Sequence, residues 1–138
     1  MRTGWGAFWV THSAKSEVRG ACLCGEVRFS GQPGSSDVTA CHCGQCRKWS
    51  GHVWASFHLE QPRIAGPVRW FASSSEAERG FCSNCGSVLF WRPLGRDTVS
   101  FSPGALDNPT GLALTGHIFV ADKGDYYQIA DGLPQRPQ

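Results

Sequence analysis

Hydrophobic and polar residues alternate over short stretches of the chain, a period of two residues that is typical of half-buried β-strands. Clusters of Gly, Pro, Ser and Asn lie between these stretches and favour turns. The only helical signals are residues 45–50, where one turn would end at Gly51, and residues 106–109, a turn or short capped helix. The sequence therefore predicts a mainly β protein. The predicted strands are 26–30, 38–40, 53–57, 63–65, 68–71, 87–91, 97–101 and 116–121, with a hairpin turn at Gly66-Pro67; residues 77–81 lead back to the next cysteine pair.

The size of the chain fits one domain and is too small for two ordinary ones, since it has 138 residues, of which 41% are hydrophobic and 17% charged. A formal net charge of +2 without a long Lys/Arg run argues against nucleic-acid binding. No segment is long enough to cross a bilayer, and residues 1–19 lack the apolar stretch of a signal peptide. We expect a poorly structured leader over residues 1–19, a single domain over residues 20–138, and coil at its end.

Cysteine is the residue type that most constrains the chemistry. The chain has seven cysteines, an odd number, and they fall into three tight clusters. A C-x-C spacing is too short for an ordinary disulfide, whereas C-x-C and C-x-x-C units present two thiolates to one metal ion. The clusters therefore predict metal binding in a reducing, cytoplasmic setting. They are Cys22-x-Cys24, Cys41-x-Cys43-x-x-Cys46 and Cys82-x-x-Cys85.

Zinc suits this set because it is tetrahedral and accepts thiolate ligands. Seven thiols divide naturally into a closed site of four and a site of three that keeps one position open. The contiguous triad of Cys41, Cys43 and Cys46 can wrap one ion, which leaves the other two pairs to meet across the chain. Alternatives remain at this point: a two-metal cluster of all seven thiolates, a partition that joins Cys82 and Cys85 to the triad, or an iron–sulfur cluster.

Histidines near the cysteines carry a weaker signal. The ring of His42 should point away from Cys41 and Cys43, either anchored to a backbone carbonyl or in a chemical role. His117 is either a core residue or a group that supports the metal site. Asp131 is best explained by a turn, and the remaining histidines, His12, His52 and His58, have no local support as ligands.

Several motifs together resemble a known family. They are GACLCGEVRFSG, CHCGQCRKWSG, RGFCSNCGSVLFW, LDNPTG and GHIFVADKGDYYQIADGLP, which span residues 20–134. The sequence is similar to the glutathione-dependent formaldehyde-activating enzymes, a family that also includes centromere protein V. The resemblance implies a β-tent of small stacked antiparallel sheets. It also implies a structural zinc on Cys22, Cys24, Cys82 and Cys85, and a second, labile zinc on Cys41, Cys43 and Cys46.

The function that the resemblance implies is that of a carbon–sulfur lyase, an enzyme of the S-(hydroxymethyl)glutathione synthase type. We expect a small-molecule thiol substrate, with glutathione as a possible co-substrate, and with Cys41, Cys43 and Cys46 at the catalytic centre. Because glutathione is anionic, the cations Arg47, Lys48 and Arg79 are candidates to bind it. Two other functions stay open: a protein-binding module with two structural zinc ions, and a redox sensor that releases zinc on oxidation.

Overall fold

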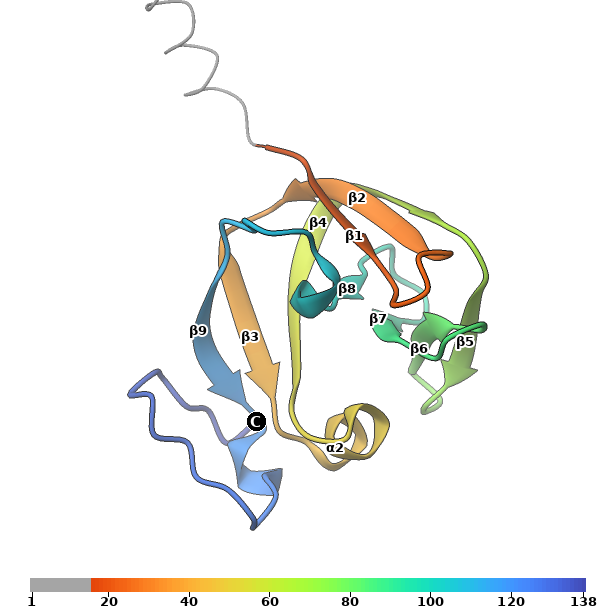
Figure 1. The fold of residues 1–138 in the computed structure, drawn as a ribbon. Coiled ribbons are helices and arrows are strands. Elements are labelled where there is room, and N and C mark those ends of the chain that lie inside the picture. The colour runs from red at the N-terminus through yellow and green to blue at the C-terminus, as the bar shows by residue number, and fades with distance from the viewer. Residues whose placement is uncertain (1–15) are drawn as a thin grey trace, which may run out of the picture.

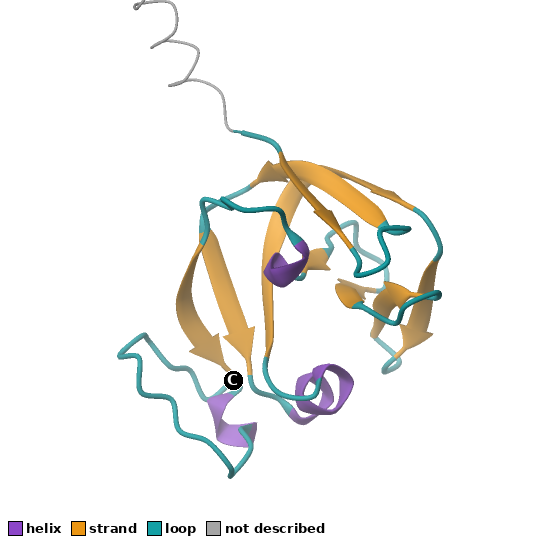
Figure 2. Cartoon of the chain, in the orientation of Figure 1, coloured by secondary structure: helices purple, strands orange, loops and turns teal. Residues whose placement is uncertain are grey.

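The computed structural model describes residues 16–138, which fold around one long central strand. Strand β4 (Trp54–Ala65) pairs with β2 near its end, with β3 near its start and with β8 in between, so that three small sheets share it (Figures 1 and 2). The described part of the chain contains nine strands in all. The others are β1 (Val18–Ala21), β2 (Arg28–Pro33), β3 (Asp37–Cys41), β5 (Val68–Ala72), β6 (Ala77–Cys82), β7 (Val88–Pro93), β8 (Ser100–Phe101) and β9 (Ala113–Ile118).

The strands are ordered β1-β2-β4-β8-β7-β6-β5, and every neighbouring pair of strands along this path is antiparallel. A separate branch continues from β4 to β3 and then to β9. The β3–β9 pair is parallel, an exception to the antiparallel arrangement that the resemblance implied. The predicted mainly β class and its small stacked sheets are confirmed.

The core lies where the sheets face one another and consists chiefly of aromatic rings. Phe29, Phe57, Phe90 and Phe101 are each at most 3% exposed. The Phe101 ring lies 5.0 Å from Phe29 and 5.4 Å from Phe90, centroid to centroid. Fully burying a Phe side chain contributes roughly 1.5–3 kcal/mol relative to exposure, so this cluster holds β2, β4, β7 and β8 together.

Helical structure is sparse in residues 16–138. The α-helix α2 (Gly44–Ser50) follows β3 and ends at Gly51, whose φ of 92° lies in the left-handed region that glycine adopts without strain. This confirms the helical turn predicted over 45–50. Two 3₁₀ turns, η1 (Pro103–Ala105) and η2 (Val120–Asp122), complete the set. No helix of the described residues is both long and apolar enough to span a membrane.

Several predicted boundaries differ from the structure. The segments 53–57 and 63–65 belong to one continuous strand, β4, because both ends find partners in different sheets. The strand predicted over 97–101 is reduced to Ser100–Phe101. The helical option for residues 106–109 is wrong, since the 3₁₀ turn lies earlier, at Pro103–Ala105.

The two ends of the domain also differ from expectation. Strand β1 begins at Val18, so residues 18 and 19 belong to the sheet and not to a leader; residues 1–15 lie outside the described part. Residues predicted as strand after Ile118 form η2 instead. The C-terminal coil is tied to β9, because the His117 N–H donates to the Pro134 carbonyl and the Arg136 N–H donates to the His117 carbonyl, both at 2.9 Å.

Candidate metal centre and the adjoining histidine chain

Four thiols from opposite halves of the chain meet at the first candidate metal site. Cys22 and Cys24 lie in the turn after β1, Cys82 is the last residue of β6, and Cys85 lies in the turn that follows. All four sulfur atoms lie within 4.8 Å of one another. Tetrahedral zinc with Zn–S bonds of about 2.3 Å needs sulfur atoms about 3.8 Å apart. The observed Cys24–Cys82 sulfur separation of 3.8 Å suits that geometry.

Backbone and side-chain donors surround these sulfur atoms, as thiolate ligands require. The Val27 N–H points at the Cys22 sulfur at 3.2 Å, and the Asn84 side-chain amide points at the Cys24 sulfur at 3.2 Å. Hydrogen bonds from Ser87 lower the pKa of Cys85 to about 5. Burial instead raises the pKa of Cys82 to about 11. A cation in the middle would supply the attraction that Cys82 needs to ionise.

The second candidate site is the triad of Cys41, Cys43 and Cys46. Cys41 ends β3, Cys43 is the N-cap of α2, and Cys46 lies in the first turns of that helix. Their sulfur atoms also lie within 4.8 Å of one another. As the N-cap, Cys43 accepts the Cys46 N–H at 3.3 Å. The structure therefore groups the thiols into four and three, the first partition considered above.

The electrostatics of the triad favour one thiolate even without a metal. The hydrogen bond from the Cys41 thiol, together with the Arg79 guanidinium, lowers the pKa of Cys46 to about 6. Because Cys41 donates this hydrogen bond to Cys46, the pKa of Cys41 is raised far above its ordinary value. One negative charge is thus held on the buried sulfur of Cys46.

Arg79 is the cation that the structure brings to the triad. It lies on β6 and is only 4% exposed. Its Nη1 is 3.7 Å from the Cys46 sulfur, its Nη2 donates to Gln45 at 3.1 Å, and its guanidinium lies 5.0 Å from the centre of the Trp49 ring. Its Nε is buried without a hydrogen-bond partner. A buried, incompletely bonded cation beside three thiols fits a site that carries negative charge.

The other two cations predicted to bind substrate lie further along α2. Arg47 donates to the Asp122 carbonyl at 3.4 Å, so it contacts the η2 turn. Lys48 is exposed. Of the three predicted cations, Arg79 alone has a hydrogen bond to a triad sulfur within the described residues.

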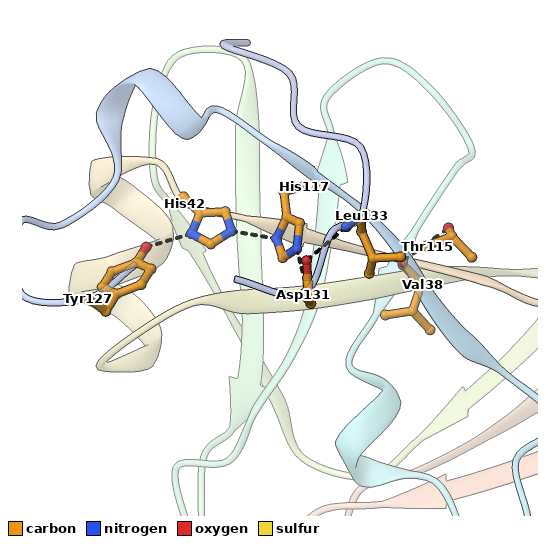
Figure 3. Close-up of polar contacts among 7 residues, drawn as sticks. All are labelled: Val38, His42, Thr115, His117, Tyr127, Asp131 and Leu133. Atoms are coloured by element: carbon orange, nitrogen blue, oxygen red, sulfur yellow. Dashed lines mark hydrogen bonds and ion pairs between the residues drawn. The ribbon is translucent and has the colours of Figure 1, made fainter. Parts of the chain in front are cut away.

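Four side chains, those of Tyr127, His42, His117 and Asp131, form a hydrogen-bonded series, called the histidine chain below (Figure 3). The Tyr127 hydroxyl lies 2.5 Å from His42 Nδ1, His42 Nε2 lies 2.9 Å from His117 Nδ1, and His117 Nε2 lies 2.8 Å from Asp131 Oδ2. Both histidines are buried, with exposures of 2% and 5%. Burial and the nearby His117 lower the pKa of His42, which keeps its ring neutral near pH 7.

The fold creates this chain through the parallel pairing of β3 and β9. Ala40 lies opposite His117 in that pair, and the His42 N–H continues the ladder by donating to the Ile118 carbonyl at 3.1 Å. The sulfur atoms of Cys41 and Cys43 join the triad, whereas the ring of His42 contacts Tyr127 and His117. Of the two alternatives left open for His42, the anchor on a backbone carbonyl is wrong, because the partners of the ring are side chains.

Two members of the chain were not predicted as site residues. Tyr127 was not singled out as a site residue, although it lies in the motif GHIFVADKGDYYQIADGLP. Asp131 makes the expected turn, in which its Oδ1 accepts the Leu133 N–H at 3.0 Å, but its second oxygen binds His117. The motif of two adjacent tyrosines followed by an aspartate four residues later, just before the C-terminus, could have suggested a shared role with His117.

The fold and the two thiol groups define a small β protein with one set of four neighbouring sulfur atoms and one set of three. Residues 17–122 match the family model described as glutathione-dependent formaldehyde-activating enzyme, and the chain belongs to this family. An uncharacterized lyase of Schizosaccharomyces pombe is 29% identical over 119 residues, which cover 83% of this chain and 87% of that protein. A crystal structure of a Rhodobacter sphaeroides protein has the same fold, with a TM-score of 0.56 and 16% identity over 85% of this chain and 98% of that one.

Proposed function

We propose that the protein is a zinc-dependent lyase that makes and breaks the carbon–sulfur bond of a thiol–aldehyde adduct of the S-(hydroxymethyl)glutathione type. The observation that carries this proposal is the unequal division of the thiols, four in one group and three in the other. The family to which the chain belongs and the printed name of the yeast relative support the same class of reaction. A thiol-rich site of this kind fits a reducing compartment such as the cytoplasm.

The triad residues would hold the catalytic metal. A zinc ion bound there would favour the ionised form of a thiol and leave one position for substrate. Three thiolates and one dication carry a net charge of −1, and the buried guanidinium of Arg79 next to Cys46 offsets it. The site therefore suits the delivery of an oriented thiolate better than strong polarisation of a carbonyl.

The reaction consists of cleavage or formation of the carbon–sulfur bond together with transfer of the hydroxyl proton. In the cleavage direction the carbon–sulfur bond breaks and sulfur keeps the electron pair. The hydroxyl oxygen becomes a carbonyl oxygen, and its proton leaves. In the synthetic direction the thiolate attacks the carbonyl carbon and the oxygen takes a proton. For a glutathione adduct, we propose the exposed Lys48 and the half-buried Arg47 on α2 as the cations that meet the carboxylates.

The test combines metal content with turnover. We expect two zinc ions per wild-type chain, and one per chain in Cys43→Ser, which should stay folded and lose cleavage of the glutathione–formaldehyde adduct. NMR line shapes or formaldehyde trapping would measure the rate at which the adduct forms and breaks. Full turnover by Cys43→Ser would contradict the proposal. Two ions that both resist mild chelation, in a protein without turnover, would instead favour the protein-binding module.

A further inference from the structure

Arg79 is a buried cation that makes no ion pair with a carboxylate within residues 16–138. The neighbouring carboxylate on β6, Glu78, pairs with Arg92 instead. Of the three guanidinium nitrogens of Arg79, Nη1 reaches the Cys46 sulfur at 3.7 Å, Nη2 donates to Gln45 at 3.1 Å, and Nε is buried without a hydrogen-bond partner. A buried charge is costly unless an opposite charge lies nearby. The anion that Arg79 meets must therefore belong to the cysteine triad.

The four-thiol site shows that the resting charge of a metal centre does not explain this placement. Four thiolates and one Zn²⁺ carry a net charge of −2, whereas three thiolates carry only −1 with the same ion. Yet the donors that reach the sulfur atoms of the four-thiol site in the described part of the chain are all uncharged. They are backbone amides of Val27, Asn84 and Cys85, the side-chain amide of Asn84 and the hydroxyl of Ser87. The guanidinium lies at the centre with the smaller charge.

The two sites differ in whether their charge can grow. Four cysteines fill the coordination of a tetrahedral ion, whereas three leave a position for another ligand. A thiolate that enters this position takes the charge of the triad centre from −1 to −2. Sulfur ligands of one zinc ion lie about 3.8 Å apart, so the incoming sulfur would be a direct neighbour of the Cys46 sulfur that Arg79 contacts. Arg79 is thus close enough to offset the charge that a fourth ligand brings.

The guanidinium of Arg79 is also held in place before any ligand arrives. It lies 5.0 Å from the centre of the Trp49 ring. Gln45, which accepts its Nη2, is fixed in turn by donating to the Ser73 carbonyl at 3.4 Å. A charge that is already in position stabilises a new anion without the cost of rearranging the site.

We propose that Arg79 makes the open position of the triad selective for ionised thiols over neutral ligands. A thiol that binds there loses its proton to solvent, and its sulfur keeps the electron pair. Arg79 acts through the charge it shares with Cys46 and does not touch the substrate, so it is a positioning residue. The inference rests on the proposed function for the presence of a thiol substrate. It adds the protonation state in which the thiol binds and the residue that decides it.

The first experiment compares an anionic and a neutral ligand through one spectroscopic signal. In the full chain, Co²⁺ replaces the second ion, and its visible absorption changes when a fourth ligand binds. Mercaptoethanol is the thiol probe, because it has no carboxylate for Arg47 or Lys48 to bind. Imidazole is the neutral probe. Cys43→Ser, which lacks the second ion, should respond to neither probe.

We expect Arg79→Met to bind mercaptoethanol about tenfold or more weakly than the wild type does, because a unit charge at this range changes an affinity by at least that factor. Its affinity for imidazole should be unchanged. Arg79→Lys keeps the charge and should retain most of the preference for the thiol. The matched control is Arg92→Met on β7, because Arg92 pairs with Glu78 and stacks on Trp70, and it should behave as the wild type.

Three results of this experiment would contradict the inference. Unchanged binding of mercaptoethanol in Arg79→Met would show that the guanidinium does not support the thiolate. Equal weakening of both probes would show that Arg79 only maintains the structure of the triad. An Arg79→Lys variant as weak as Arg79→Met would show that the positive charge is not what selects the ligand.

The second experiment uses the wild type alone, so it stays decisive even where a variant at a buried position does not fold. Isothermal titration calorimetry in two buffers of different ionisation enthalpy counts the protons that binding releases. At about pH 8 a free thiol is still largely protonated and imidazole is neutral. We expect close to one proton released for each mercaptoethanol bound and none for imidazole. Binding of the thiol without proton release would overturn the inference.

These measurements also separate the inference from the proposed function. A wild type that prefers the thiol, and an Arg79→Met variant that loses this preference, would support the inference even in a protein that does not cleave the glutathione–formaldehyde adduct. In that case the protein binds thiols without being a lyase. Cleavage of the adduct by a wild type that binds the thiol without releasing a proton would leave the proposed function and refute the inference.

Discussion

The four-thiol site should act as a long-range staple, and its contribution to stability can be worked out from the sequence separation it closes. Cys24 and Cys82 are 58 residues apart. If one ion cross-links the chain as a disulfide does, closing a loop of about 58 residues removes roughly 4 kcal/mol of unfolded-state entropy. The triad spans only six positions, from Cys41 to Cys46. The same relation gives about 2 kcal/mol or less for so short a loop.

Matched double variants separate the stability contributed by the four-thiol site from that contributed by the triad. Cys22→Ser/Cys24→Ser removes one arm of the staple, and Cys41→Ser/Cys43→Ser removes most of the triad. In urea unfolding with zinc present, we expect the first variant to lose about 4 kcal/mol and the second about 2 kcal/mol or less.

A chelator provides the internal control. With metal removed, wild type and the first variant should unfold at nearly the same urea concentration, because neither is then cross-linked. Equal losses in the two double variants, or a large difference that persists in chelator, would refute the staple.

Two further substitutions test the turn that supports the first site and the charge balance of the second. Gly66→Ala places a methyl group on a residue with φ of 104° and against backbone atoms of the neighbouring turn, whereas Gly95→Ala, at φ 81°, meets nothing within 4 Å. Calorimetry should show that the free energy of unfolding falls by roughly 2–5 kcal/mol in Gly66→Ala and by about 1–2 kcal/mol in Gly95→Ala. Equal losses in the two variants would rule out the close approach at Gly66. Arg79→Met removes a cation that lowers the pKa of Cys46, so the pH at which acid releases the second zinc should rise by about one unit. The control is Arg92→Met on β7, because the Arg92 side chain stacks on the Trp70 ring, and this variant should leave the release pH unchanged. An unaltered release pH in Arg79→Met would show that Arg79 does not balance the charge of the site.

The grouping of the cysteines could be predicted because it depends mostly on local spacing. Three thiols within six residues can reach one ion whatever the rest of the chain does, and the other two pairs then have each other as partners. Most of the short strands were also predictable, since their alternation is local, but β1 and β6 were not predicted as strands. The continuity of β4 was not, because it depends on three different sheets meeting on one strand.

The histidine chain could not be predicted for a related reason. His42 and His117 are 75 residues apart, and Tyr127 lies 85 residues from His42. Their contact depends on the parallel β3–β9 pairing and on a C-terminal segment that returns along β9. Neither feature has a signature in the spacing of apolar residues. Sequence patterns therefore located the thiols and missed the polar groups that tertiary pairing brings together.

The contrast between the two thiol groups has a functional consequence. The ion of the first site would tie β1 to β6, so its loss would loosen the whole domain. The triad is held by one short segment that β3, α2 and their neighbours already position, so its metal could come and go while the fold persists. A site that must open a coordination position to substrate needs that independence. If the proposed function holds, the domain would separate the two requirements, with stability supplied by the distant cysteines and chemistry by the adjacent ones.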